Sequence, residues 1–142
     1  MSGGLLLDNS AWARLGDPSL SAERAEEIAA ALEDGRIATC LPFLLEAGYS
    51  ARSADDHSDL IEELLALQTI RMDEEIELRA LDAQAQLARA AHHRLPPVDL
   101  LLASIADLRD LGVLHYDADF DLIAGKTDLT FDSVWLAPRG SL

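Results

Sequence analysis

Carboxylates follow two apolar runs that have the length and composition of buried strands. Asp8 comes directly after Leu5–Leu7, and Asp117 comes directly after the run 113–116. In open parallel sheets, ligands bind outside the carboxyl ends of the strands. We therefore expect both carboxylates to lie at one edge of a sheet, where they can act on a common ligand.

Two more acids lie near the predicted starts of helices. Glu46 lies about one turn into a helix that follows the strand ending near Cys40, and Asp99 comes just after the Pro96-Pro97 break. Like charges a few ångströms apart repel, and no lysine or arginine is adjacent in sequence to any of these acids. A divalent cation is the natural counter-charge. Mg²⁺ on carboxylate oxygens can activate water for attack on a phosphodiester.

Each acid also has a purely structural interpretation, which the sequence leaves open. Asp8 could be a helix N-cap, and Asp117 and Asp119 could cap a short helix that follows them. Asp99 in a first helical turn would interact favourably with the helix dipole, and Glu46 could be a solvated helix position. The combination of acids therefore predicts a site, whereas no single position does.

The elements that would position these acids alternate between strand and helix. The expected strands are Leu5–Leu7, 36–40, 69–72, 113–116 and 134–136. The expected helices are 11–15, 21–32, 43–51, 55–67, 73–93, 98–108 and 117–124. This alternation predicts an α/β fold, a sandwich in which helices flank a mainly parallel sheet of roughly four to five strands. Gly35 and Gly112 are expected to end the helices that precede them.

Composition excludes several classes of protein. The 142 residues suffice for a single domain over 1–142, and a hydrophobic content of 49% suffices for a buried core. Lys and Arg number 11 against 26 Asp and Glu, so the net charge is −15. That charge argues against an ordinary basic nucleic-acid-binding domain and a polybasic membrane anchor. The single cysteine, Cys40, excludes an intramolecular disulfide and a cysteine-cage zinc site.

Hydropathy indicates a cytoplasmic location without membrane association. Residues 1–4 carry no basic side chain and the apolar run after them is short, so we expect no signal peptide. No apolar run approaches the ~20 residues of a membrane span. The sequence also contains no glycine-rich phosphate loop and no nucleophile elbow, so nucleotide cofactors and serine hydrolysis have no support.

Other residues capable of chemistry favour structural interpretations. His115 lies inside a predicted strand, where a packed or hydrogen-bonded histidine is expected more often than a base. Trp135 is expected in the core, and Cys40 is expected to be a small buried hydrophobe. His92-His93 lies near a predicted helix C-terminus, where protonated histidine interacts favourably with the dipole.

The acidic positions also carry a family resemblance. Segments that contain them resemble, in order, the motifs of the PIN-domain ribonucleases, specifically the VapC toxins of bacterial toxin–antitoxin pairs. The segments are 6–11 with Asp8, 41–52 with Glu46, 97–106 with Asp99, and 115–124 with Asp117–Phe120 in the pattern D-x-D-F. The resemblance covers essentially the whole chain, and it implies a PIN-like three-layer sandwich.

The resemblance also implies an activity, a cofactor and partners. It implies an endoribonuclease dependent on Mg²⁺, with Mn²⁺ as the alternative, that forms a homodimer and is neutralised by a cognate VapB-like antitoxin. The implied catalytic residues are Asp8, Glu46, Asp99, Asp117 and Asp119. Of these, Asp8, Asp99 and Asp117 are the implied metal ligands, and whether Asp117 or Asp119 is the closer ligand stays open.

Residues beside the acids have supporting roles in this interpretation. Ser10, with Asn9, would orient a carboxylate or a metal-bound water. Because RNA phosphates need local positive charge, Arg14 and Arg52 are candidate RNA contacts, with Lys126 after the fourth motif. The alternative for each of these cations is an ordinary solvated surface charge, which is the more common role of such residues.

The antitoxin is expected to bind across apolar stripes on the helices 21–32 and 43–67, with a basic side chain entering the acidic pocket. Those stripes could instead face the core. The main alternative function is a catalytically silent PIN-like module that binds RNA or protein. A structure-specific DNA nuclease ranks lower, because the chain lacks an inserted basic arch.

Overall fold

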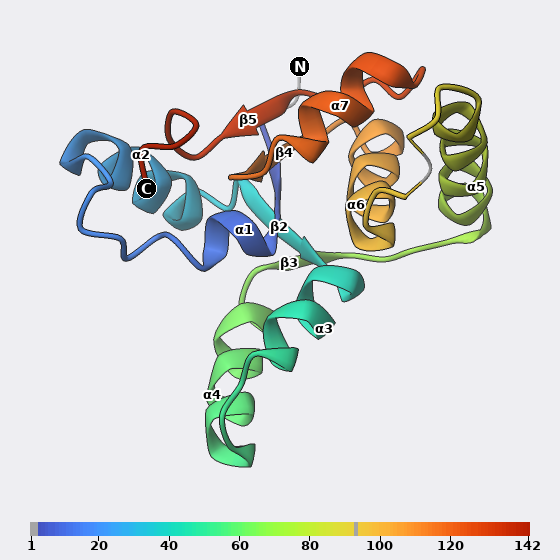
Figure 1. Cartoon of the computed structure of the whole chain (residues 1–142). Coiled ribbons are helices and arrows are strands. Elements are labelled where there is room, and N and C mark those ends of the chain that lie inside the picture. The colour runs from blue at the N-terminus through green and yellow to red at the C-terminus, as the bar shows by residue number, and fades with distance from the viewer. Residues whose placement is uncertain (1–2, 93) are drawn as a thin grey trace.

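Five strands form one all-parallel sheet in the order β3-β2-β1-β4-β5 (Figure 1). The computed structural model describes residues 3–92 and 94–142. The strands are β1 Leu5–Leu7, β2 Ile37–Cys40, β3 Gln68–Ile70, β4 Gly112–His115 and β5 Ser133–Trp135. The α/β class and the parallel sheet expected from the sequence are confirmed. The first strand in the chain is the central one, which places Asp8 in the middle of the sheet edge.

Helices connect every pair of consecutive strands, as parallel pairing requires. They are α1 Asn9–Trp12, α2 Ala22–Glu33, α3 Leu41–Tyr49, α4 Ala54–Leu65, α5 Glu74–Arg89, α6 Pro97–Leu108 and α7 Asp119–Lys126. Figure 1 shows α2 on one side of the sheet and α5 with α6 on the other. The pair α3 and α4 extends away from the rest of the molecule (Figure 1).

The core sits on both faces of the central strands. Leu6 and Leu7 of β1 and Val113 and Leu114 of β4 are all buried, because helices cover both faces of a parallel sheet. A second apolar cluster joins α5, α6 and α7. Its buried members are Ala83, Leu87, Leu100, Ala103, Ile123 and Leu129. This cluster fixes α6 and α7, the helices that carry Asp99 and Asp119.

Some boundaries differ from the expected ones. The first helix begins at Asn9 rather than residue 11, because Asp8 caps it by accepting a hydrogen bond from the Ser10 backbone. Gly35, with a φ of 69°, follows α2 as expected. The expected end of α5 at residue 93 lies outside the described residues, and α5 ends at Arg89.

Gly112 was expected to end the preceding helix, but it is instead the first residue of β4. The helix ends at Leu108, and the left-handed residue after it is Asp110, with a φ of 55°. A Cβ at position 112 would lie 2.9 Å from Leu5 Cδ2 and 3.1 Å from the Asp132 carbonyl oxygen. Glycine therefore allows the neighbouring strands to approach closely here, and a larger residue would have to displace the Leu5 side chain and the Asp132 backbone.

Candidate metal centre

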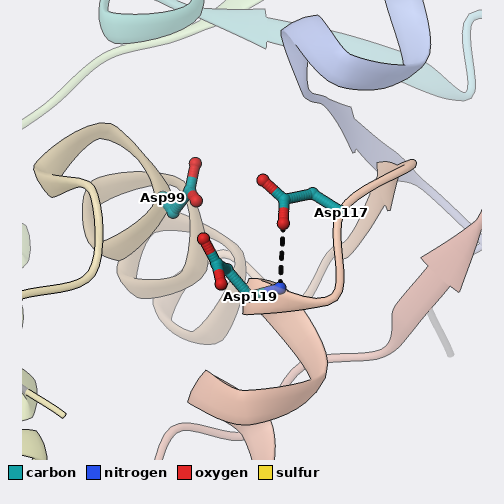
Figure 2. Close-up of side chains that lie close together, drawn as sticks. All are labelled: Asp99, Asp117 and Asp119. Atoms are coloured by element: carbon teal, nitrogen blue, oxygen red, sulfur yellow. Dashed lines mark hydrogen bonds between the residues drawn. The ribbon is translucent and has the colours of Figure 1, made fainter.

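Three aspartates, from α6, from the loop after β4 and from the start of α7, converge at the carboxyl end of the sheet (Figure 2). One carboxylate oxygen from each of Asp99, Asp117 and Asp119 lies within 4.8 Å of the others. Asp117 stands on the loop after β4, and its Oδ1 accepts a hydrogen bond of 2.9 Å from the Asp119 backbone N–H. Asp117 therefore holds the start of α7 and also belongs to the cluster, so its position is compatible with both the structural and the chemical interpretation.

Asp99 is the most strongly perturbed acid of the group. The Pro96-Pro97 break places it in the first turn of α6, where it is 6% exposed. Its Oδ2 is buried and has no hydrogen-bond partner among the described residues. Burial, together with repulsion from Asp8, Asp117 and other acids, raises the pKa of Asp99 to about 8. A buried carboxylate in this state is expected to bind a cation or to hold a proton.

Asp8 is buried beside the cluster and is held by Ser10. Asp8 Oδ2 accepts hydrogen bonds from the Ser10 backbone N–H at 2.9 Å and from the Ser10 hydroxyl. Asp8 Oδ1 is buried without a partner among the described residues. Burial raises the pKa of Asp8, although the Ser10 hydrogen bonds oppose that shift. Ser10 Oγ also accepts from the Tyr116 backbone N–H at 2.8 Å, so it links the ends of β1 and β4.

Glu46 and Asn9 lie at the margin of the site. Glu46 is half-buried on α3, and burial, with repulsion from Asp8 and Asp117, raises its pKa. Neither Asp8 nor Glu46 belongs to the group of three that shares one small volume, but both lie close enough to Asp99 to raise its pKa. Asn9 is the half-buried first residue of α1.

The candidate RNA-contacting cations lie at different distances from the acids. Arg14 lies beside the site, because its Nη1 donates to the Ser10 carbonyl at 2.9 Å and its guanidinium lies 4.9 Å from the centre of the Tyr116 ring. Arg52 is exposed at the junction of α3 and α4. Lys126 is the last residue of α7, at the opposite end of that helix from Asp119.

The expected structural roles of the other residues are mostly confirmed. Cys40 is fully buried, and burial raises the pKa of its thiol to about 11. His115 is buried, and its ring nitrogens are hydrogen-bonded. Burial lowers the pKa of His115 to about 4. Trp135 is half-buried rather than in the core, because its indole N–H reaches the exposed Asp121 at 2.9 Å.

Sequence reasoning did not single out Asp121 or Ser133, which contact each other at 2.7 Å beside His115. Asp121 lies two residues after Asp119, and its position as the third acid of the D-x-D-F-D run is the sequence feature that could have marked it as a candidate. The partner Ser133 lies on a different strand, so no local pattern connects the two.

The acids fit a hard divalent cation. The donors of the cluster are carboxylate oxygens, the ligand type that Mg²⁺ and Mn²⁺ prefer. Two of the buried oxygens, one of Asp8 and one of Asp99, have no hydrogen-bond partner among the described residues.

The sequence model of the PIN domain family matches residues 5–126 of this chain. The chain therefore belongs to the PIN domain family. The match includes all the acids described above and excludes only the ends of the chain.

Within that family, the chain resembles VapC ribonucleases. It is 37% identical to ribonuclease VapC18 of Mycobacterium tuberculosis over 139 residues, which cover 96% of this chain and 97% of that protein. It is 38% identical to ribonuclease VapC51 of the same species over 137 residues, covering 96% of each. The fold matches DNA-bound VapBC from Salmonella typhimurium with a TM-score of 0.72 at 15% identity, covering 94% of this chain and 98% of that chain.

Proposed function

We propose that this chain is a VapC-type toxin, an endoribonuclease that uses Mg²⁺ or Mn²⁺ to hydrolyse RNA and that is inhibited by a VapB-like antitoxin. The observation that carries the proposal is the group Asp99, Asp117 and Asp119 within 4.8 Å, next to buried carboxylate oxygens that lack partners. Near-full-length similarity to ribonucleases supports the activity.

Each acid of the site has a proposed role that follows from its position. Asp99, Asp117 and Asp119 would hold the cation, with Asp8 completing the site beside them. When bound, the cation supplies Lewis acidity and a lowered pKa for its water. Glu46 lies at the margin and has a raised pKa, so it would take the proton of the attacking water. The products would carry a 5′-phosphate and a 3′-hydroxyl.

Ser10 would set the direction of the Asp8 carboxylate. It donates to Asp8 through both its backbone and its hydroxyl, and it accepts from Tyr116 on the neighbouring strand. Asn9 would support the same turn. Arg14, bound to the Ser10 carbonyl, would contact an RNA phosphate entering the site, and Arg52 would contact the strand further out.

The surface of α3 and α4 would receive the antitoxin. Leu41, Leu45, Tyr49 and Leu65 are all more than half exposed, and they line a groove of about 500 Å³. In contrast to the sequence expectation, no residue of α2 lines this groove, and Ile28 and Ala31 of α2 are buried in the core. Solved structures of similar fold include VapBC complexes from several bacteria, which supports an antitoxin partner.

A homodimer and a cytoplasmic location complete the proposal. Leu78 and Leu81 of α5 are exposed apolar side chains suited to pairing with a second copy. Among the described residues, no helix is both long enough and apolar enough to cross a membrane. The proposed RNA substrate favours the cytoplasm.

The test is a map of new RNA 5′ ends after this chain is induced in bacteria without antitoxin, beside the Asp99→Asn variant. A few sharp 5′-monophosphate ends that appear only with the unchanged protein are expected, and their sequences would identify the target. If both proteins accumulate equally in folded form and the maps do not differ, the silent binding module is the better interpretation.

A further inference from the structure

A chain of hydrogen bonds runs from the acidic cluster to the far side of β4. The Asp117 backbone N–H donates to His115 Nδ1 at 3.1 Å. On the other side of the ring, His115 Nε2 lies 2.7 Å from Ser133 Oγ. The Ser133 hydroxyl donates to Asp121 Oδ1 at 2.7 Å, and Trp135 Nε1 donates to Asp121 Oδ2 at 2.9 Å. The chain of bonds thus begins at the loop that carries Asp117 and ends at a carboxylate on α7.

These contacts fix the tautomer of His115. Because Nδ1 accepts from the Asp117 backbone, the ring proton must lie on Nε2, which then donates to Ser133 Oγ. The Ser133 hydroxyl in turn donates a hydrogen bond to Asp121 Oδ1. The Asp121 carboxylate therefore accepts from both Ser133 and Trp135, and it orients the Ser133 hydroxyl that faces His115.

Packing alone does not require a histidine at this position. His115 is 0% exposed, and its ring stacks on Phe120 at 4.8 Å and meets the edge of Trp135 at 5.0 Å. An apolar aromatic ring would make the same contacts without the cost of burying two polar nitrogens. The contribution particular to the imidazole is thus its pair of hydrogen bonds, one of which ends at a proposed metal ligand.

We propose that His115 is a positioning residue for the metal centre. Held as the Nε2–H tautomer by Ser133 and Asp121, it fixes the Asp117 backbone and so aims both Asp117 and Asp119, whose own N–H binds Asp117 Oδ1. Figure 2 shows Asp117 on this loop and Asp119 at the start of α7, with both carboxylates near Asp99. The inference rests on the proposed function, because it assumes that these acids share a cation.

Three substitutions of His115 separate its hydrogen bonds from its packing. His115→Phe keeps the aromatic contacts and removes both nitrogens. His115→Asn places an oxygen near the position of Nδ1, so it retains an acceptor for the Asp117 N–H. His115→Gln reaches towards Ser133 in place of Nε2 but offers no acceptor near Asp117. Thr39→Val is the matched control, since Thr39 is a buried polar residue on β2 of the same sheet.

The experiment measures Mg²⁺ affinity by calorimetry and the Asp117 amide resonance by NMR in the metal-free protein. We expect His115→Phe and His115→Gln to weaken Mg²⁺ binding by about 10-fold or more, in line with the 10–100-fold effects of groups that orient metal ligands. His115→Asn is expected to stay within about 3-fold of the unchanged protein, and Thr39→Val is expected to bind normally. The Asp117 amide should shift only in the two variants that lack the acceptor.

The two measurements distinguish a failure of this inference from a failure of the proposed function. If the unchanged protein does not bind Mg²⁺, the proposed function fails, and the assumption that the acids share a cation fails with it. If it binds Mg²⁺ and His115→Phe binds equally well, the inference about His115 is wrong. A proton on Nδ1 of His115, detected through its ¹⁵N shifts, or an unmoved Asp117 amide in His115→Phe, would overturn it as well.

Discussion

At the scale of single residues, Asp99 is where burial and charge conflict most strongly. It is 6% exposed, its Oδ2 lacks a partner among the described residues, and its pKa is raised to about 8. Folding therefore costs free energy whenever this carboxyl is ionised without a cation. The same conflict makes the position suitable for a metal, which supplies the missing charge and the missing partner.

The Asp99→Asn variant should be more stable and inactive. The amide keeps the shape but removes the buried charge, so the metal-free free energy of unfolding at pH 8 should rise by about 1.4 kcal/mol or more, the equivalent of one pKa unit. Cleavage of RNA should fall by more than about 100-fold, since groups that merely orient ligands are worth 10–100-fold. Urea denaturation and a cleavage assay on the same preparation test both effects. A variant that is less stable and still active would contradict this interpretation.

The stability of the metal-free protein should depend on pH in a defined direction. The pKa of Asp99 rises from an ordinary 3.8 to about 8 on folding, so between these values the folded state binds more protons than the unfolded state. The Asp99 contribution to the free energy of unfolding therefore falls as pH rises from about 4 to about 8. Denaturation of the unchanged protein and of Asp99→Asn across this range should show the difference, and parallel pH profiles would refute it.

Metal binding should release protons for the same reason. At pH 7 the Asp99 carboxyl is mostly protonated in the metal-free protein, and a metal ligand must be deprotonated. Calorimetric titration with Mg²⁺ in two buffers of different ionisation enthalpy should report close to one proton released at pH 7 and fewer at pH 9. Heats that are independent of the buffer would contradict the assignment of Asp99 as a ligand.

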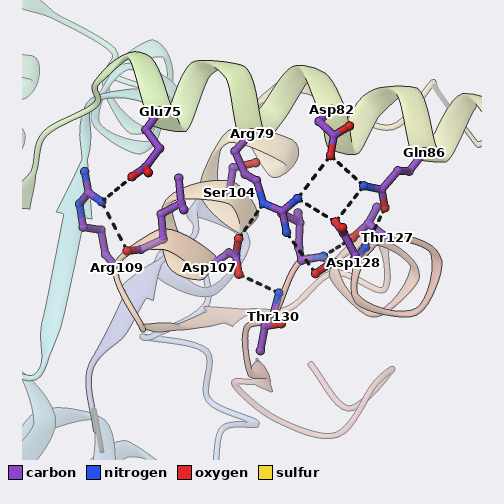
Figure 3. Close-up of polar contacts among 12 residues, drawn as sticks. Glu75, Arg79, Asp82, Gln86, Ser104, Asp107, Arg109, Thr127, Asp128 and Thr130 are labelled. Carbon is purple, nitrogen blue, oxygen red and sulfur yellow. Dashed lines mark hydrogen bonds and ion pairs between the residues drawn. The ribbon is translucent and has the colours of Figure 1, made fainter.

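At the scale of elements, Arg79 fixes the helices that present the acids (Figure 3). From α5 it donates to Asp107 on α6 at 2.9 Å and to Asp128, just after α7, at 2.8 Å. These contacts tie together the C-terminal ends of α6 and α7. The opposite ends of the same helices carry Asp99 and Asp119, so Arg79 helps to set the spacing of the cluster.

Loss of the Arg79 contacts to Asp107 and Asp128 should destabilise the protein more than loss of a surface ion pair. Arg79 is 22% exposed and Asp107 is 12% exposed, so Arg79→Ala leaves the partly buried Asp107 without a cation and should cost about 1–3 kcal/mol. Arg79→Lys should recover only part of this stability, because a lysine ammonium cannot reproduce the several N–H donors of the planar guanidinium. Arg36→Ala is the control, since its pair with Asp34 is exposed on both sides and worth at most about 1 kcal/mol. If the urea midpoints of Arg79→Ala and Arg36→Ala fall by the same amount, the proposed role of Arg79 in holding α5, α6 and α7 together is wrong.

The sequence predicted most of the elements, because their signals are local. The apolar runs before Asp8 and Asp117 and the Pro96-Pro97 break gave the strand ends and the helix start that carry the acids. Contacts between strands are not local, so the close approach at Gly112 and the bond from His115 to Ser133 were not predictable. Nor could spacing alone show which acids would share one small volume.

At the scale of the whole molecule, the net charge of −15 opposes the approach of RNA. Exposed acids on α2, α4 and α5 contribute much of that charge. Their repulsion acts over a Debye length, which shrinks from about 20 Å to about 8 Å when NaCl rises from about 20 to 150 mM. At saturating Mg²⁺, kcat/KM for RNA cleavage should therefore stay constant or rise over this range. A steep loss of kcat/KM with salt, typical of proteins that neutralise many phosphates, would contradict this expectation.

The central claim is that the buried acids at the sheet edge cleave RNA with a divalent cation. Its most direct test is cleavage of total bacterial RNA by the purified, antitoxin-free protein, beside Asp99→Asn and the exposed control Glu26→Gln, which removes the same charge from α2. The unchanged protein and Glu26→Gln should cut RNA with Mg²⁺, stop with EDTA and resume when Mg²⁺ is restored, whereas Asp99→Asn should not cut. Cleavage that persists in EDTA, or equal cleavage by Asp99→Asn, would contradict the claim.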